Sequence, residues 1–138
     1  MVGRFLFLLV LSGLFFTVTP SSAADAEMKF ELFKDRSGDY RWRLKGPDGA
    51  LMALSAIGHK RPADAQADLD TIRKSDFAGE LKFETFVDES NSYRWRLISE
   101  RGQTVAISSV GYKGEIEADR AIASLKVGAG KATVIVLK

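Results

Sequence analysis

Short runs in which apolar and polar residues alternate recur along most of the chain, and this period of two predicts β-strands with one buried face. In the run Tyr40–Lys45, Trp42 and Leu44 fall on one side of the strand, and Arg41 and Arg43 fall on the other. The matching run Tyr93–Ile98 predicts a second such strand, and the short Phe-rich runs Phe30–Lys34 and Phe83–Val87 and the matched runs Leu51–Ser55 and Thr104–Ser108 predict four more. Residues that favour tight turns are frequent in the connections Asp35–Asp39, Gly46–Gly49 and Asp88–Ser92. The first three strands along the chain and the next three are therefore each predicted to form an antiparallel meander.

Two later segments have the period of an amphipathic helix. Their apolar residues are spaced i, i+4 and i+7, at Ala65, Leu69 and Ile72 and again at Ala118, Ile122 and Leu125. Pro62 suits the first turn of the first helix. Because the apolar stripe is narrow, we expect each helix to pack one side on the sheet and leave the rest in water.

The chain ends in a continuous apolar and β-branched run, Ala132–Leu137. The loss of alternation predicts a strand that is covered on both sides or inserted between other strands.

An internal repeat organises these elements. Residues 29–74 align without a gap to residues 82–127, with 17 identities in 46 positions, and the pentapeptide Tyr40–Leu44 recurs unchanged at Tyr93–Leu97. One copy of about 50 residues buries too little apolar surface to be secure alone. We therefore expect repeat 1, residues 28–78, and repeat 2, residues 81–138, to form one α+β domain with a shared antiparallel sheet and two helices on one face.

Residues 1–23 differ in kind from the rest of the chain. Arg4 is the only charge before Asp25, the stretch Phe5–Phe16 is almost wholly apolar, and small residues follow it as far as Ala23. This layout predicts a secretory signal peptide cleaved near Ala23, and hence a periplasmic or secreted bacterial protein. The alternative is a retained N-terminal anchor, although the apolar stretch is shorter than the ~20 residues that span a bilayer.

Composition and charge narrow the range of partners. Loss of Arg4 lowers the formal net charge from +2 to +1, which provides no strong attraction for nucleic acid or for an anionic membrane. The chain has no Cys, so thiol chemistry and cysteine-bound metals are excluded. We expect no cofactor, no nucleic acid partner and no stable membrane span after cleavage; an anionic envelope component or a protein is the expected kind of partner.

The repeated motif resembles the YegP-like family of bacterial proteins of unknown function. The residues that carry the resemblance, each with its partner 53 positions later, are Phe30, Glu31, Phe33, Asp35, Tyr40–Leu44, Gly49, Ala53, Ser55 and Gly58. The resemblance implies tandem β-β-β-α-β units in one sheet, with the C-terminal strands exchanged between the units. It implies no catalytic residues, because the family has no established activity. His59 departs from the pattern, since the second copy has Tyr112 there.

Four arginines in the two identical pentapeptides are the candidate anion-binding residues: Arg41, Arg43, Arg94 and Arg96. If their tryptophan neighbours face the helices, four guanidinium groups share the other sheet face, where they are able to grip a phosphate, sulfate or carboxylate. The competing interpretation is cross-strand ion pairing, with Glu31 opposite Arg43 and Glu84 opposite Arg96, at ~0.2–1 kcal/mol for each pair.

The remaining candidates carry less weight. Trp42 and Trp95 are interpreted first as core residues and second as a stacking platform for a sugar or base. His59 is the only histidine, and no sequence motif marks a serine nucleophile that it could activate. The loop carboxylates Asp35, Asp39 and Asp88 are too few to provide the ligands of a calcium site. We therefore expect no catalytic or metal-binding residues. The chain is interpreted as a non-enzymatic binding or interaction module that uses either the Arg-bearing sheet face or an exposed strand edge. The alternative is a structural or stress-related envelope protein without a small-molecule ligand.

The signal-peptide hypothesis predicts the N-terminus of the exported protein. N-terminal sequencing of the protein isolated from periplasm or medium is expected to begin at Ala24, or at Asp25 or Glu27 if the neighbouring small residues are used. Recovery of the intact chain from Met1 in the membrane fraction would instead identify a retained anchor.

Overall fold

The computed structural model describes residues 27–138, so the segment interpreted as a signal peptide lies outside the described residues. The elements, in chain order, are β1 (Lys29–Lys34), β2 (Tyr40–Lys45), β3 (Leu51–Ser55), α1 (Pro62–Lys74), β4 (Leu81–Val87), β5 (Tyr93–Ser99), β6 (Thr104–Ser108), α2 (Glu115–Gly128), the 3-10 helix η2 (Ala129–Lys131) and β7 (Thr133–Val136). The strands and helices predicted from periodicity are present, and their ends differ from the predicted ends by two residues at most.

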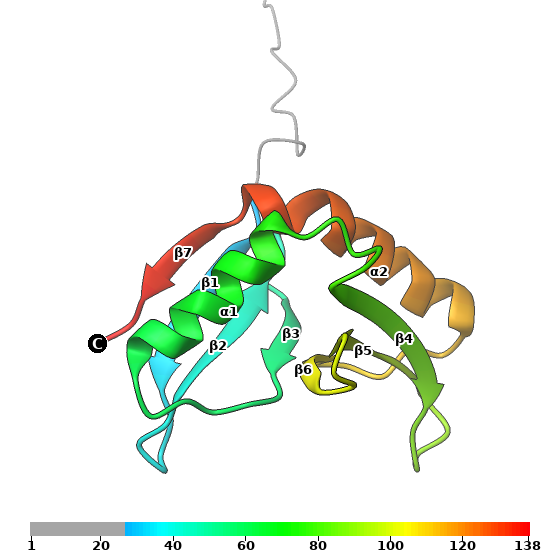
Figure 1. The fold of residues 1–138 in the computed structure, drawn as a ribbon. Helices are drawn as coiled ribbons and strands as arrows, with labels where there is room; N and C mark the ends of the chain where they lie inside the picture. The colour runs from blue at the N-terminus through cyan, green and yellow to red at the C-terminus, as the bar shows by residue number, and fades with distance from the viewer. Residues whose placement is uncertain (1–26) are drawn as a thin grey trace, which may run out of the picture.

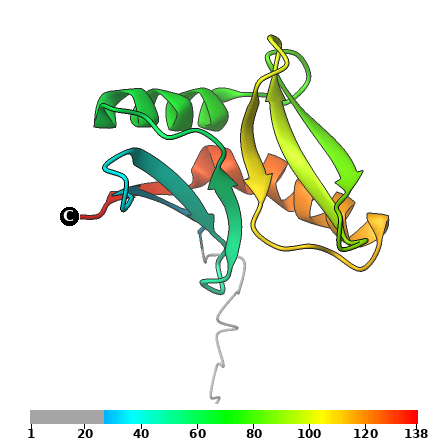
Figure 2. The ribbon, with the colours of Figure 1, turned by 90° about the horizontal axis from the view of Figure 1, so that it is seen from below.

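All seven strands belong to one sheet, in the order β4-β5-β6-β3-β2-β1-β7. Each half contributes an antiparallel meander, and the halves meet where β3 pairs antiparallel with β6, with Ala53 opposite Ser108 and Ser55 opposite Ala106. Figure 1 and Figure 2 show this seam at the middle of the sheet, with the two meanders spreading to either side.

The last strand corrects two of the expectations. β7 pairs with β1 in parallel, with Lys29 opposite Thr133 and Leu32 opposite Val136, so the sheet is mixed and not wholly antiparallel. β7 is also the outermost strand, and Ile135 and Val136 are exposed. It is therefore neither covered on both sides nor inserted. The chain reaches this edge through α2 and η2, which connect β6 in the second half of the sheet to β7 beside β1 in the first half.

A reciprocal strand after α1 is not present among residues 27–138. The segment between α1 and β4 contains no strand of its own, and it leads directly into β4. The one strand that joins the other half of the sheet is thus β7, beside β1.

Each helix presents the predicted apolar stripe to the sheet. The buried residues of α1 are Ala65, Leu69 and Ile72, and those of α2 are Ala118, Ile122 and Leu125. Pro62 opens α1, where its missing N–H costs nothing, and Glu115 and Glu117 lie in the first turn of α2, where a carboxylate favours the positive end of the helix dipole.

Buried residues from both halves form one hydrophobic cluster. Phe30, Trp42 and Leu69 come from the first half, and Trp95 and Leu125 come from the second. Because the strands alternate, these residues lie on the sheet face that carries the helices, and the opposite face is left to solvent.

Two glycines allow the loop after each meander to approach the neighbouring hairpin. A Cβ atom at Gly58 would lie 2.9 Å from the Asp39 Cβ, and one at Gly111 would lie 2.6 Å from the Ser92 Cβ. His59 and Tyr112 follow these glycines and bridge to the backbone of Tyr40 and Tyr93, respectively. The departure from the motif at His59 thus leaves the backbone pairing the same in both halves.

Within residues 27–138, no helix is long and apolar enough to cross a membrane.

The shared cluster predicts the behaviour of an isolated half. A chain that ends at Ser75 keeps β1, β2, β3 and α1 but loses both β6 and β7, which leaves the outer edges of β1 and β3 without their partner strands. We expect this fragment to be unfolded or self-associated, as measured by amide proton dispersion and analytical ultracentrifugation. A folded, monomeric fragment would contradict the need for a shared sheet.

Candidate binding surface: the outer sheet face and its free edge

The four candidate arginines lie on the sheet face opposite the helices. In β2, Trp42 and Leu44 are buried, and the arginines that alternate with them are half-buried; β5 repeats this pattern. Period-two alternation therefore places all four guanidinium groups on one face, as the sequence predicted.

Arg41 and Arg94 hold the hairpin loops against the ends of the central strands. Arg41 Nε donates to Asp35 Oδ2 at 2.7 Å, and its Nη1 donates to the carbonyl of Ser55 at 3.4 Å. Arg94 makes the same two bonds, to Asp88 at 2.6 Å and to the carbonyl of Ser108 at 3.1 Å. Both guanidinium groups are thus engaged in structural contacts.

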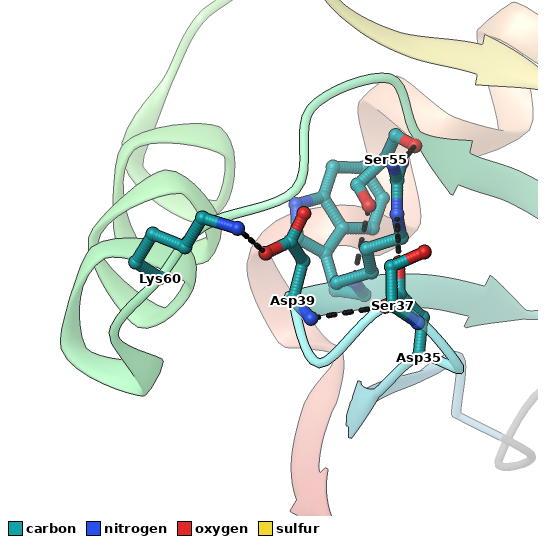
Figure 3. Close-up of polar contacts among 7 residues, drawn as sticks. Asp35, Ser37, Asp39, Ser55 and Lys60 are labelled. Atoms are coloured by element: carbon teal, nitrogen blue, oxygen red, sulfur yellow. Dashed lines mark hydrogen bonds and ion pairs between the residues drawn. The ribbon is translucent and has the colours of Figure 1, made fainter.

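The carboxylates of these pairs also organise the loops (Figure 3). Asp35 Oδ1 accepts hydrogen bonds from the backbone N–H groups of Ser37 and Asp39, and Lys60 pairs with the side chain of Asp39. Hydrogen bonds from Arg41 and from backbone N–H groups lower the pKa of Asp35. The pKa of Asp88 is lowered first by the backbone N–H of Ser92 and then by Arg94.

Arg43 and Arg96 form the cross-strand pairs that the loop length predicted. Arg43 lies opposite Glu31 and binds its carboxylate, while Arg96 lies opposite Glu84 and binds it at 2.7 Å. Each guanidinium carbon also lies 5.2 Å from the centre of a phenylalanine ring, Phe33 for Arg43 and Phe86 for Arg96. The cross-strand interpretation thus has its partners in place, whereas the anion site remains an untested prediction.

Trp42 and Trp95 are core residues and do not form a stacking platform. Their side chains are 2% and 1% exposed, respectively. Each packs edge-to-face on a phenylalanine, Phe30 at 5.5 Å and Phe83 at 5.4 Å between ring centres.

Ser55 and Ser108 have a role that the sequence analysis missed. Each is buried, and its hydroxyl oxygen accepts the backbone N–H of a core tryptophan, Trp42 and Trp95 respectively. Their identity at equivalent positions of the two copies was the signal that could have revealed this role.

His59 contacts a carboxylate of the following helix, and the loop carboxylates belong to no metal-binding group in the described residues. His59 Nε2 bonds Asp68 Oδ2 on α1, which ties the preceding loop to the helix. Among residues 27–138, no group of three or more His, Asp or Glu residues is placed to hold a metal ion.

The outer edge of β4 is a second surface that the sequence analysis did not locate. β4 ends the sheet on one side and has no strand beyond it in the described chain. Alternate residues of β4 direct their backbone groups toward β5, and these are the even-numbered ones. At one end of the pairing the N–H of Glu100 donates to the carbonyl of Glu80, and at the other the N–H of Asp88 donates to the carbonyl of Ser92. The register is unbroken between these points, so the backbone groups of Phe83 and Thr85 point away from β5.

β1 is the counterpart of β4 and has the same geometry, but its edge is occupied. Thr133 N–H donates to the carbonyl of Met28, and Leu137 N–H donates to the carbonyl of Leu32. The even-numbered residues of β1 correspond to the odd-numbered residues of β4 at the offset of 53. The outer edges of β1 and β4 therefore present equivalent backbone donors and acceptors. β7 pairs with those of β1, and those of β4 have no strand beside them in the described chain.

Comparisons with known proteins identify relatives without an assigned activity. Residues 88–135 match the model of a domain of unknown function, DUF1508. A UPF0339 protein of Methanosarcina acetivorans is 44% identical over 57 residues, which is 41% of this chain and 97% of that protein. A UPF0339 protein encoded in the ptx operon 5′ region of Stutzerimonas stutzeri is 26% identical over 106 residues, which covers 77% of this chain and 93% of that protein.

Two solution structures share the fold. One is a UPF0339 protein of Shewanella oneidensis, with a TM-score of 0.69 at 17% identity. The other is the protein of unknown function YegP of E. coli, with the same TM-score at 22% identity. Each match covers 80% of this chain and 92% of the other.

The loop carboxylates predict a loss of stability in acid. A carboxyl whose pKa is lowered by folding stabilises the protein above its unfolded pKa, about 3.9 for Asp, and this contribution is lost as the pH falls through the folded pKa. We expect the melting temperature of the protein to decrease as the pH is lowered below about 4. The double variant Asp35→Asn, Asp88→Asn should have a lower melting temperature at neutral pH and should lose less of it in acid. Glu89→Gln, in the exposed second loop, is the matched control. If the melting temperature of the double variant decreased as steeply in acid as that of the unmodified protein, these two carboxylates would not be the source of the acid sensitivity.

Proposed function

The chain belongs to the UPF0339 (DUF1508) family, and on that premise we propose that it is an exported, non-enzymatic module that binds an extended segment of a partner protein along the free edge of β4. Proteins commonly recognise peptides by adding a strand to an exposed sheet edge, where main-chain hydrogen bonds provide affinity and alternate side chains provide specificity.

One observation carries the proposal: two nearly identical strands, each the outer strand of its own meander, differ in whether another strand pairs beside them. β1 reads KFELFK, and β4 contains KFETFV at the equivalent positions. β1 receives β7, and β4 receives nothing within residues 27–138. A strand of this sequence and orientation is thus able to accept an extended segment, because its counterpart does so in the same molecule.

Edge charges offer a competing explanation. Proteins place lysine and other charged residues on edge strands to discourage unwanted pairing, and Lys82 and Glu84 are exposed on β4. However, Lys29 and Glu31 occupy the same positions of β1, where β7 pairs beside them. These charges are therefore compatible with an added strand.

The anion hypothesis has weaker support from the contacts. Arg41, Arg43, Arg94 and Arg96 each bind a carboxylate, so a bound phosphate or sulfate would have to displace a partner already in place. The alternative of an envelope protein without a small ligand makes a different prediction, namely that the β4 edge binds no segment at all.

Export and the class of partner rest on the sequence. The signal-peptide pattern of residues 1–23 supports a periplasmic or secreted protein, and the small net charge of the remaining chain favours a protein partner over nucleic acid.

We also infer that the two halves arose by duplication of one unit. The identities at a constant offset support this origin, as does the recurrence of the arginine–aspartate and serine–tryptophan contacts at that same offset.

Backbone amide exchange tests the proposed strand addition. The probe is a synthetic peptide with the sequence of Lys131–Lys138, titrated into the purified, isotope-labelled protein. We expect the peptide to slow exchange of the Phe83 and Thr85 amides, which point outward, and to leave those of Lys82 and Glu84 unchanged, because they already face β5.

Controls for this experiment lie within the same molecule. The Phe30 and Leu32 amides, which face β7, should stay protected. Thr85→Pro removes one outward N–H at an edge position that tolerates proline, and it should abolish the effect. The peptide is added up to about 1 mM, which is the weak end of specific binding. If amide exchange at Phe83 and Thr85 is unchanged at that concentration, strand addition at this edge is refuted.

A further inference from the structure

The two halves treat the glutamate of their first strand differently. Glu31 binds two cations, Arg43 Nε at 2.5 Å and Lys45 Nζ at 3.0 Å. Glu84 binds one, Arg96 Nη2 at 2.7 Å, because Ile98 occupies the position of Lys45. The site in the second copy therefore has one positive charge fewer than the otherwise equivalent site in the first.

Exposure follows the same difference. The Glu31 side chain is 12% exposed, whereas that of Glu84 is 49% exposed. Ile135 of β7 lies directly beside Glu31 in the parallel register, whereas no strand of residues 27–138 lies beside Glu84. Glu84 thus has a free carboxylate oxygen at the edge where a strand is missing.

We propose that the segment bound by β4 runs parallel to it and carries a lysine or arginine at the residue that lies beside Glu84. This inference rests on the proposed function, and it specifies the chemistry of the partner segment. The added cation replaces the one that Lys45 provides to Glu31 in the first half.

The β1–β7 pairing supplies the register. β7 places its first four residues beside Lys29, Phe30, Glu31 and Leu32. At the offset of 53, positions 1 to 4 of a bound segment lie beside Lys82, Phe83, Glu84 and Thr85. Positions 2 and 4 then share the helix-bearing face with Phe83 and suit β-branched residues, as Val134 and Val136 do in β7.

Positions 1 and 3 share the outer face and have opposite charge requirements. Position 3 lies beside Glu84, and position 1 lies beside Lys82, which would repel a cation there. The expected segment is neutral or acidic at position 1, β-branched at positions 2 and 4, and basic at position 3.

The strand β7 of a second copy meets this specification poorly. Its third residue is Ile135, which offers no charge to Glu84. Residues 27–138 contain one β7 and two equivalent edges, so exchange of β7 between copies always leaves one edge without this strand. The expected occupant of the β4 edge is therefore a segment of a different polypeptide with a basic residue at position 3.

Three peptides that differ only at position 3 test the charge requirement. Their core sequences are Thr-Val-Lys-Val-Leu, Thr-Val-Ile-Val-Leu and Thr-Val-Glu-Val-Leu, and affinity is measured from amide shifts of Phe83 and Thr85 in the purified protein. We expect the lysine peptide to bind about fivefold more tightly than the isoleucine peptide, which is the upper range for an exposed charge pair, and the glutamate peptide to bind most weakly.

Variants at the two glutamates separate this effect from general changes in stability. Glu84→Gln should remove the preference for lysine, and the charge reversal Glu84→Lys should transfer the preference to the glutamate peptide. Glu31→Gln, at the equivalent position of the occupied edge, should leave the preference intact. Amide dispersion of each variant shows that it is folded.

A nitroxide at the peptide N-terminus tests direction. A parallel segment should broaden the amide signals near Leu81, and an antiparallel segment those near Val87. Equal affinity of the three peptides, or broadening near Val87, would overturn this inference while strand addition itself survives. Failure of every peptide to perturb Phe83 and Thr85 would instead refute the proposed function.

Discussion

The pairing of β3 with β6 is the interaction on which the rest of the structure depends. It joins two meanders, each too small for its own core, into one sheet, and it brings Trp42 and Trp95 into one buried cluster with both helices. Ser55 and Ser108 lie on these same two strands, and each holds a tryptophan backbone N–H at the seam. The geometry of the central strands therefore fixes the positions of the two aromatic anchors.

The pairing of β3 with β6 also determines the pattern of charged and apolar side chains on the sheet face opposite the helices. One row of residues crosses it in register, from Glu31 and Arg43 through Leu54 and Ile107 to Arg96 and Glu84. Charge is thus balanced within each half and the centre is apolar. The charged side chains of this row already have partners within the sheet, and the unpaired backbone groups of the sheet lie at its edges.

Much of the fold was predictable because its determinants are local. Alternation and short apolar runs between turn residues located six strands, five-residue loops set the register of Glu31 with Arg43, and i, i+4, i+7 spacing located the buried side of each helix. The location of β7 was not predictable in this way. A continuous apolar run is compatible with a central strand or with an edge strand, and only the long-range pairing with β1 decides between them.

The candidate site shows a similar limit. The sequence placed four arginines on one face, yet their carboxylate partners Asp35 and Asp88 depend on how each hairpin loop folds back. The free edge of β4 is a property of topology and has no local signature. A comparison of the aligned copies could still have revealed the change from Lys45 to Ile98, which leaves Glu84 with a single cation.

The pairing of β1 with β7 unites the first strand of the described chain with the last, residues 29 and 133 among them. The ribosome delivers β1 well before β7, so this contact has a high sequence separation and forms late. Until β7 is in place, the outer edge of β1 stays unpaired. Deletion of β7 would make that state permanent and would turn the edge of β1 into an aggregation hazard.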